Sequence, residues 1–377
     1  MFKLITKLFV IQIIFLLSIA CSSGIDYSSK NELIPLNPIP PVTPVPPVNT
    51  IYKTKPVLIP IQPQSSKETN KFKLIEPKQP KLATKKIINS KKTNSKKTKT
   101  IPPTSYPLII TDSNEKNVIF KKSPEKIIAF DSAAVEIIYE IGAGDKIIGT
   151  HSFVNFPEST NNIEKVGDAF NLNIESVINL EPDLFYIFFE QYINQLENNK
   201  IKVLYQKSLN GNFESIPERI IMWGEILNKN QEALNSANLF KTRLDNIKIF
   251  FKNYSDGPTV FYDTGSLWTP GHDTLIGQTL DLLKLQNIAK DISGYKQYSK
   301  ELIIQNNPQI IITSSPEYFA NSSEFKNLTA VKNKRIITIN QELLSIAGPR
   351  FIDGIEELGV AIYSPIFNKI LLSKIDK

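Results

Sequence analysis

The chain has 377 residues and carries 44 Lys and Arg against 37 Asp and Glu, which gives a formal net charge of +7. Its single cysteine excludes an intrachain disulfide framework, a zinc site built from several cysteines and a CxxC redox motif. The length leaves room for two folded domains with sizeable cores.

The first residues are typical of an export signal. Two lysines precede an apolar run over residues 8–19, which is too short to span a bilayer as a mature helix. Ala20 and Cys21 follow this run, and the segment resembles the lipobox of bacterial lipoproteins, although Ser18 stands where that pattern prefers an aliphatic residue. The resemblance implies that residues 1–21 are a lipoprotein signal peptide and that Cys21 carries the lipid. An ordinary signal peptide with a coincidental cysteine is the alternative.

Residues 22–106 show no apolar period long enough to build a core, and we expect a disordered tether there. Fifteen of the 25 prolines lie between residues 22 and 107, where they favour an extended chain. The same segment has a net charge of +11, so the foldable residues 108–377 carry −6. Its lysines could attract anionic lipids or the cell wall, or could simply keep a spacer soluble. Nucleic-acid binding is not expected, because no aromatic residues interleave with the lysines.

From residue 107 onward, short apolar strands alternate with amphipathic helices. In a first lobe over residues 107–213 we expect, in chain order, a hairpin of strands 108–111 and 117–120, strand 126–130, helix 133–141, strand 146–149, helix 174–180, strand 183–188, helix 192–199 and strand 202–205. Such a βαβ series predicts a parallel sheet with helices on both faces.

Residues 214–256 have no strand pattern, but apolar residues recur there at helical spacing. We expect a long connecting helix of about 25 residues, which would run roughly 38 Å. A second lobe over residues 257–377 is predicted to contain strand 259–262, helix 274–285, helix 299–306, strand 309–313, strand 335–339 and a closing helix 349–363. The predicted fold class is therefore α/β, with two doubly wound lobes joined by a long connecting helix and preceded by the disordered tether.

Several segments, in this order and spacing, resemble one family of binding proteins. They are residues 123–130, Glu136 with Ile137, residues 141–149, Val166 with Gly167, residues 173–184, and Gly348-Pro349-Arg350. Across residues 107–365 the chain resembles the substrate-binding proteins of ABC importers for iron siderophores, haem and vitamin B12, which have the class III periplasmic-binding fold. The resemblance implies a protein that binds without catalysis, in a cleft between two lobes that close only slightly. No GxSxG, GxxxxGKS/T or HExxH motif points to an enzyme.

The loops that follow the predicted strands supply the candidate ligand-binding residues, because pockets concentrate at the carboxyl ends of parallel strands. The candidates are His151, Phe153, Asp168, Phe170 and Phe189 in the first lobe and Tyr262, Trp268, His272, Tyr295 and Arg350 in the second. By resemblance, Phe153 matches the position where vitamin B12-binding members place a cleft aromatic, whereas Ala169 falls where those proteins carry a Trp. As a group, the aromatic residues favour a planar or macrocyclic ligand over a small polar solute.

Histidine and arginine narrow the choice of ligand. His151 and His272 are the only two histidines, one in each lobe, and as neutral imidazoles they could ligate the metal of haem or of a cobamide. Structural or surface roles are their alternative. An anionic ferric siderophore would need several cationic side chains in the cleft, and Arg350 is the only clear candidate. The alternative role for Arg350 is to form an ion pair or to cap a helix. We therefore favour haem or another tetrapyrrole, including a cobamide, over a ferric siderophore.

Two carboxylates are candidates for docking on the transporter. By resemblance, Glu175 matches a transporter-facing carboxylate of the family, and Asp273 holds the corresponding place in the second lobe. Each lies near a predicted helix N-terminus, so stabilisation of the helix dipole is the alternative.

Together these features predict a substrate-binding lipoprotein of an ABC importer. It would capture an iron- or cobalt-containing chelate, either haem or a cobamide or a ferric siderophore, between its lobes and deliver it to a permease with its ATPase. We expect a monomer in the cell envelope, held by its lipid on the periplasmic or extracytoplasmic face of a membrane, with no catalytic residues and no catalytic cofactor. The alternative is a structural or adhesive cell-envelope lipoprotein that has the same fold but does not transport.

Overall fold

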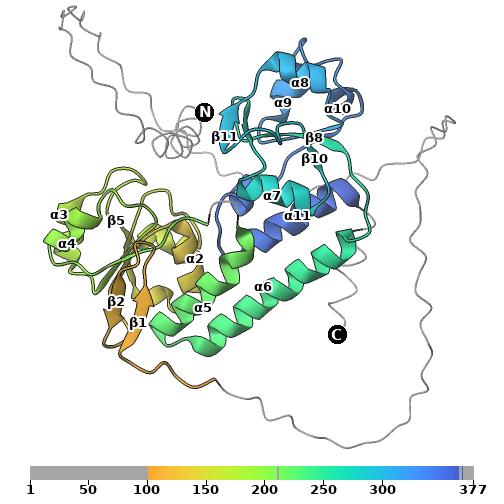
Figure 1. Cartoon of the computed structure of the whole chain (residues 1–377). Coiled ribbons are helices and arrows are strands. Elements are labelled where there is room, and N and C mark those ends of the chain that lie inside the picture. The colour runs from red at the N-terminus through yellow and green to blue at the C-terminus, as the bar shows by residue number, and fades with distance from the viewer. Residues whose placement is uncertain (1–100, 210–211, 365–366, 368–377) are drawn as a thin grey trace, which may run out of the picture. The chain divides into compact units, whose positions relative to one another are not determined.

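The structure of the chain is a computed structural model that describes residues 101–209, 212–364 and Phe367 (Figure 1). The predicted signal peptide, Cys21 and most of the predicted tether lie outside the described residues. Within the described part, no helix combines the length and the apolar character needed to cross a membrane. Both parallel sheets and the helices between them belong to one compact unit.

The first lobe is built on a five-stranded parallel sheet with the strand order β5-β4-β3-β6-β7, and β1 and β2 form a separate antiparallel hairpin. Its elements are β1 (Leu108–Thr111), β2 (Asn117–Phe120), β3 (Ile127–Phe130), α2 (Ser132–Glu140), η1 (Gly144–Lys146), β4 (Ile147–Thr150), η2 (Glu158–Asn162), β5 (Glu164–Lys165), α3 (Ile174–Leu180), β6 (Leu184–Ile187), α4 (Ile193–Asn198) and β7 (Val203–Tyr205). The predicted strands and helices of this lobe are confirmed, whereas the two-residue strand β5 was not expected.

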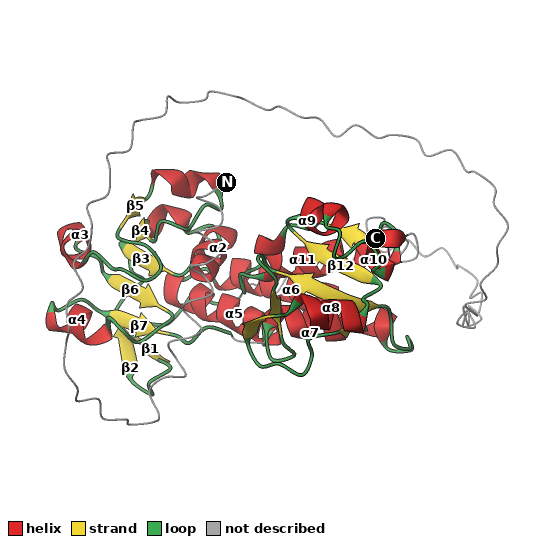
Figure 2. Cartoon of the chain, turned by 90° about the horizontal axis from the view of Figure 1, so that it is seen from above, coloured by secondary structure: helices red, strands yellow, loops and turns green. Residues whose placement is uncertain are grey.

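The local sequence explains where these elements begin and end. The Asp131 carboxylate accepts a hydrogen bond from the Ala133 N–H (3.0 Å) and caps α2, and Gly142, with a φ of 72°, takes the left-handed conformation just after that helix. Asn173 caps α3 in the same way by accepting from the Ser176 N–H (3.0 Å). Alternate residues of the central strands point to opposite faces of the sheet. One face packs against α2, and the other face packs against α3 and α4 (Figure 2).

The connector is helical as expected, but it is a pair of helices. It consists of η3 (Phe213–Ser215), α5 (Ile216–Leu227) and α6 (Asn230–Phe251). Asn228 ends α5 in the left-handed conformation, with a φ of 54°, and α6 packs back along α5 (Figure 1). This differs from the expected single helix because the apolar spacing continues across the turn, so periodicity alone does not reveal the break.

The last residues of the predicted tether are bound to this turn. The Thr104 N–H donates a hydrogen bond to Asn228 Oδ1 (2.7 Å), and the Tyr106 hydroxyl donates to the Ile226 carbonyl (2.8 Å). The expected tether, residues 22–106, is therefore too long at its C-terminal end, because Thr104 and Tyr106 are bound to the connector.

The second lobe contains a four-stranded parallel sheet in the order β10-β8-β12-β13. Its elements are β8 (Thr259–Asp263), β9 (Trp268–Pro270), α7 (Leu275–Leu282), β10 (Gln286–Asn287), β11 (Tyr295–Gln297), α8 (Lys300–Asn306), β12 (Ile310–Thr313), α9 (Pro316–Asn321), α10 (Thr329–Lys332), β13 (Ile336–Ile337), η4 (Gln341–Leu344) and α11 (Phe351–Tyr363). The predicted strands and helices of this lobe are confirmed. The antiparallel pair β9–β11, the short strand β10 and the helices α9 and α10 were not expected.

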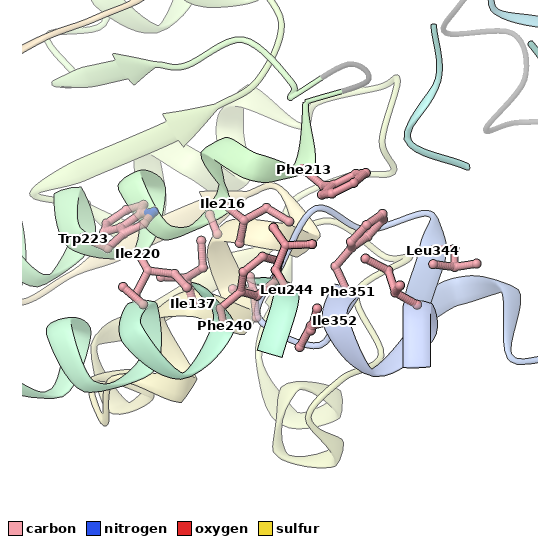
Figure 3. Close-up of a cluster of buried hydrophobic side chains, with 14 of the residues drawn as sticks. Ile137, Phe213, Ile216, Ile220, Trp223, Phe240, Leu244, Leu344, Phe351 and Ile352 are labelled. Atoms are coloured by element: carbon pink, nitrogen blue, oxygen red, sulfur yellow. The ribbon is translucent and has the colours of Figure 1, made fainter. Parts of the chain in front are cut away.

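Side chains from both lobes and from the connector share one hydrophobic core (Figure 3). Ile137 of α2, Trp223 of α5 and Phe240 of α6 all belong to it. Phe213 stacks on Phe351 of α11, with the ring centroids 5.4 Å apart. Because burying one such aliphatic or phenyl side chain stabilises by about 1.5–3 kcal/mol, the shared core ties both lobes firmly to the connector. The predicted α/β class with two lobes is confirmed.

Candidate ligand-binding site

Aromatic side chains gather where the strands of the first sheet end. Phe130 is the last residue of β3, His151 directly follows β4, and the centroids of their rings lie 5.4 Å apart. The ring of Phe153 lies 6.2 Å from that of His151, and the ring of Phe189, just after β6, lies 6.2 Å from that of Phe130. Phe153 and Phe189 are half-buried. Three of the predicted residues, His151, Phe153 and Phe189, therefore share one cluster at the carboxyl edge of this sheet.

His151 is buried within this cluster, with 4% of its surface exposed. Its Nε2 lies 3.3 Å from the Ser132 hydroxyl, while its Nδ1 is buried with no hydrogen-bond partner among the described residues. Burial lowers the pKa of the imidazole to about 4, and the nearby charge of Lys165 adds to this effect. The ring is therefore neutral at pH 7 and packs inside the aromatic cluster.

We expect the buried histidine to make the stability of the protein depend on acid pH. In the unfolded chain His151 binds a proton below about pH 6.5, whereas in the folded chain it does so only below about pH 4. The free energy of unfolding therefore falls as the pH drops from 6.5 to 4. The loss from this residue by pH 4.5 should be about 2–3 kcal/mol. His151→Gln should reduce the loss measured by urea unfolding between pH 7 and pH 4.5, whereas the exposed His272→Gln should not. An unchanged pH dependence in His151→Gln would contradict this expectation.

Asp168 organises a turn and does not offer a free carboxylate. Its Oδ1 accepts hydrogen bonds from the backbone N–H groups of Phe170 (2.8 Å) and Asn171 (2.7 Å). Burial acts to raise the pKa of this carboxyl, but the hydrogen bonds from the Asn171 side chain and from the two N–H groups lower it below its ordinary value. Phe170 is half-buried, and its carbonyl accepts a hydrogen bond from the Tyr192 hydroxyl. The turn thus fixes the position of Phe170.

In the second lobe, a strained turn carries Trp268. The buried Asp263, at the end of β8, accepts hydrogen bonds from the N–H groups of Gly265 (3.0 Å) and Leu267 (2.9 Å) and from the Thr313 hydroxyl (2.8 Å). All three residues from Gly265 to Leu267 have positive φ angles. Trp268 is half-buried in the strand that follows. An Asp followed by Gly two positions later at the end of a strand is a recognisable turn signal, and Asp263 with Gly265 fits it.

The two predicted tyrosines differ in exposure. Tyr262 has no exposed surface and lies in the core of the molecule, where its hydroxyl has no hydrogen-bond partner among the described residues. Tyr295, in β11, is half-buried opposite Pro270, and burial raises the pKa of its hydroxyl to about 12. Of the two, only Tyr295 has exposed surface.

The two histidines are not brought together by any described contact. His272 is exposed, and its Nδ1 lies 2.9 Å from the Lys290 carbonyl, whereas the ring and hydrogen-bond contacts of His151 are with residues of the first lobe. Across the described ranges, no three His, Cys, Asp or Glu side chains gather as a metal site. The described contacts therefore give no support to the interpretation of the histidine pair as joint metal ligands.

Arg350 joins the two lobes. Its Nη2 donates to Glu136 Oε1 of α2 (2.5 Å), and its guanidinium carbon lies 3.4 Å from the centre of the Phe156 ring. The Glu136 side chain also lies close to the backbone at Gly348, because a Cβ added at Gly348 would lie 2.6 Å from Glu136 Oε2. The structure thus gives Arg350 the ion-pair role that was the alternative to ligand binding.

The described surface includes a hollow beside Arg350 and another beside Tyr298. One, of about 120 Å³, is bounded by α2, α6 and the start of α11, next to Arg350. The other, of about 310 Å³, is lined by Leu267, Gln297, Tyr298, Ser299 and Lys300. Leu267 directly precedes Trp268 in the chain, but Trp268 is not among the residues that line this hollow.

The helices α3 and α8 occupy equivalent places in the two lobes. Each has seven residues, begins after a side-chain cap, Asn173 or Ser299, and leads through a proline into a central strand, β6 or β12. Corresponding positions differ by 126 residues, so Glu175 is equivalent to Glu301, and both glutamates are exposed. Glu301 was not predicted, although the repeated pattern of cap, glutamate and proline could have revealed it.

Asp273, which was predicted as the second docking carboxylate, has local partners. Its two carboxylate oxygens accept hydrogen bonds from the Ser293 hydroxyl (2.5 Å) and from the Gly294 N–H (2.7 Å). It is exposed, but these bonds give it a role in holding the loop before β11.

Comparisons with known proteins converge on one family. The model of the periplasmic binding protein family matches residues 127–343. The chain is 30% identical over 278 residues to the uncharacterized ABC transporter substrate-binding lipoprotein YvrC of Bacillus subtilis, which spans 70% of this chain and 88% of that protein. It is 24% identical over 243 residues to the vitamin B12-binding protein of Pectobacterium atrosepticum, spanning 61% of this chain and 85% of that protein. The molybdate-bound periplasmic protein MolA of Haemophilus influenzae has the same fold, with a TM-score of 0.63 and 20% identity over 71% of this chain and 95% of that one.

Proposed function

The chain belongs to the periplasmic binding protein family, and we propose that it captures a metal-containing tetrapyrrole, with a cobamide as the first choice. The family makes it the substrate-binding protein of an ABC transporter and not an enzyme. Its partner is therefore a membrane permease.

The aromatic cluster at the carboxyl edge of the first sheet carries the ligand proposal. The half-buried Phe153 and Phe189 offer flat apolar surfaces there, backed by the buried neutral ring of His151, and the half-buried Trp268 offers another in the second lobe. Such surfaces suit a planar macrocycle, whose faces are themselves largely apolar. Similarity to a vitamin B12-binding protein over most of its length favours a cobamide over haem.

Charge at the candidate residues disfavours a strongly anionic ligand. Arg350 is committed to Glu136, and His151 is neutral at pH 7. A ferric siderophore with several negative groups, or a small dianion such as molybdate, would need cations free to pair with it. None of the ten predicted ligand-binding residues supplies such a cation.

Removing either aromatic wall should weaken binding. Phe153→Ala and Trp268→Ala should each raise the Kd for cyanocobalamin more than tenfold, a change of about 1.4 kcal/mol or more per ring. Isothermal titration calorimetry measures this without relying on tryptophan fluorescence. Tyr318→Ala removes an exposed ring of α9 and serves as the matched control, which should bind like wild type. Wild-type affinity in both site variants would show that these rings do not form the site.

We also propose that Glu175 and Glu301 dock the protein on its permease. They are exposed, one on each lobe, and their helices are equivalent, so they can pair with equivalent basic sites on a two-fold symmetric partner. Glu301 takes the place of Asp273 in this proposal because the oxygens of Asp273 already hold its own loop.

A lipid on Cys21 is the proposed attachment to the membrane. The related protein of Bacillus subtilis is a substrate-binding lipoprotein, which supports this reading of the first 21 residues. More than one acyl chain is needed for stable anchoring, since a single chain gives only reversible binding. The protein would then work on the extracytoplasmic face, where the chelate arrives.

A further inference from the structure

An exposed isoleucine accompanies the proposed docking carboxylate on each lobe. Ile178 of α3 is 41% exposed, and Ile304 of α8 is 45% exposed. The two isoleucines are related by the same 126-residue offset as Glu175 and Glu301. The residue before each isoleucine is completely buried, so both helices lie on their lobes in the same orientation.

The sequences of the two helices single out these positions. IESVINL in α3 and KELIIQN in α8 agree only at the glutamate and at this isoleucine. Residues three apart lie on the same side of a helix, so Glu175 adjoins Ile178 and Glu301 adjoins Ile304. One exposed isoleucine is ordinary on a protein surface, but packing within the lobe does not explain why the same acid and apolar pair recurs on both.

We propose that Ile178 and Ile304 are apolar anchors of the docking surface, each inserted beside a basic residue on one half of a two-fold symmetric permease. This inference rests on the proposed docking through Glu175 and Glu301. Two equivalent pairs fit a partner with two equivalent halves, and a protein interface typically places apolar anchors among charged residues. The net charge of −6 on residues 108–377 complements a basic partner. Figure 1 shows α3 and α8 on the sides of their lobes away from α5 and α6.

The test uses the full-length lipoprotein and a permease–ATPase complex chosen by gene neighbourhood and reconstituted in nanodiscs. The double variant Ile178→Ser, Ile304→Ser should bind this complex at least tenfold more weakly than wild type, while its Kd for cyanocobalamin and its Tm stay within error. The double variant Ile109→Ser, Ile249→Ser is the matched control. It removes two isoleucines that are 55% and 69% exposed on other surfaces, and it should dock like wild type.

The outcomes separate the anchors from the proposed function. If the Ile178→Ser, Ile304→Ser variant docks normally while reversal of the two glutamates prevents docking, the anchor inference is overturned and the proposed function stands. Equal loss of docking in the control variant would also overturn the anchors, because any exposed isoleucine would then have the same effect. If sedimentation shows that the two isoleucines hold a dimer of this chain, the occupant of the surface is a second copy and the inference is wrong. A wild-type protein that binds neither the complex nor a chelate would overturn the proposed function itself.

Discussion

Replacing both Glu175 and Glu301 with lysine should abolish transport while the ligand affinity and the Tm stay nearly unchanged. Docking of an acidic face on a basic partner depends on both sites, and charge reversal turns two attractions into two repulsions. Like charges placed together at an interface cost several kcal/mol, so the loss should be close to complete. Uptake of labelled cyanocobalamin by cells that carry only the variant measures the effect.

A second pair of glutamates controls for charge reversal in general. Glu164 and Glu317 are exposed, one on each lobe, and lie outside α3 and α8, so the Glu164→Lys, Glu317→Lys variant should transport normally. If Glu175 and Glu301 only stabilise their helix dipoles, their reversal should cost about 0.3–1 kcal/mol of stability at each site and leave uptake intact. Normal uptake would therefore remove them from the docking surface.

Removing Arg350 should destabilise the protein by about 3–5 kcal/mol, because Arg350→Met leaves the Glu136 carboxylate buried without its counter-ion. Burial already raises the pKa of Glu136, and the hydrogen bond and charge of Arg350 offset this only in part. In Arg350→Met the folded-state pKa should rise further, so the folded chain binds a proton that the unfolded chain does not hold above about pH 4.5. The destabilisation should thus be largest at pH 7 and above and should shrink as the pH falls toward 5.

Urea unfolding at pH 5 and pH 7.5 tests this expectation. The double variant Arg350→Met, Glu136→Gln removes both charges and should recover much of the loss at pH 7.5, because a neutral pair leaves no buried ion. Equal losses in the single and double variants, or a loss that is independent of pH, would show that the ion pair is not the cause.

Local signals in the sequence were sufficient to predict most elements of the fold. Asp131, Asn173 and Ser299 each cap a helix through a hydrogen bond that spans two or three residues, so their positions could be read directly. The pair β9–β11 could not be read, because its strands have three residues each and their pairing joins segments that are distant in the chain. The break between α5 and α6 had a weaker signal in the sequence. Asn228 ends α5 in the left-handed conformation, and asparagine is one of the residues that favour this conformation at a helix end.

The candidate site was predictable to the extent that it follows strand ends. His151, Phe153 and Phe189 were found in this way, because the carboxyl ends of parallel strands meet at one edge of the sheet. The burial of Tyr262 and the ion pair of Arg350 depend on contacts between distant segments, and nothing in their immediate sequence reveals them. Glu301 shows the opposite case, since its signal was present in the sequence but only a comparison of the two lobes brings it out.

Titration of the wild-type protein with cyanocobalamin, haem and a ferric hydroxamate siderophore tests the central claim most directly. We predict saturable binding of a tetrapyrrole, the cobamide first, with a Kd below about 1 μM, which corresponds to about −8.2 kcal/mol. Binding of the siderophore should be at least about a hundredfold weaker, a difference of about 2.7 kcal/mol. Tight binding of the siderophore alone, or no binding of any of the three, would contradict the proposed function.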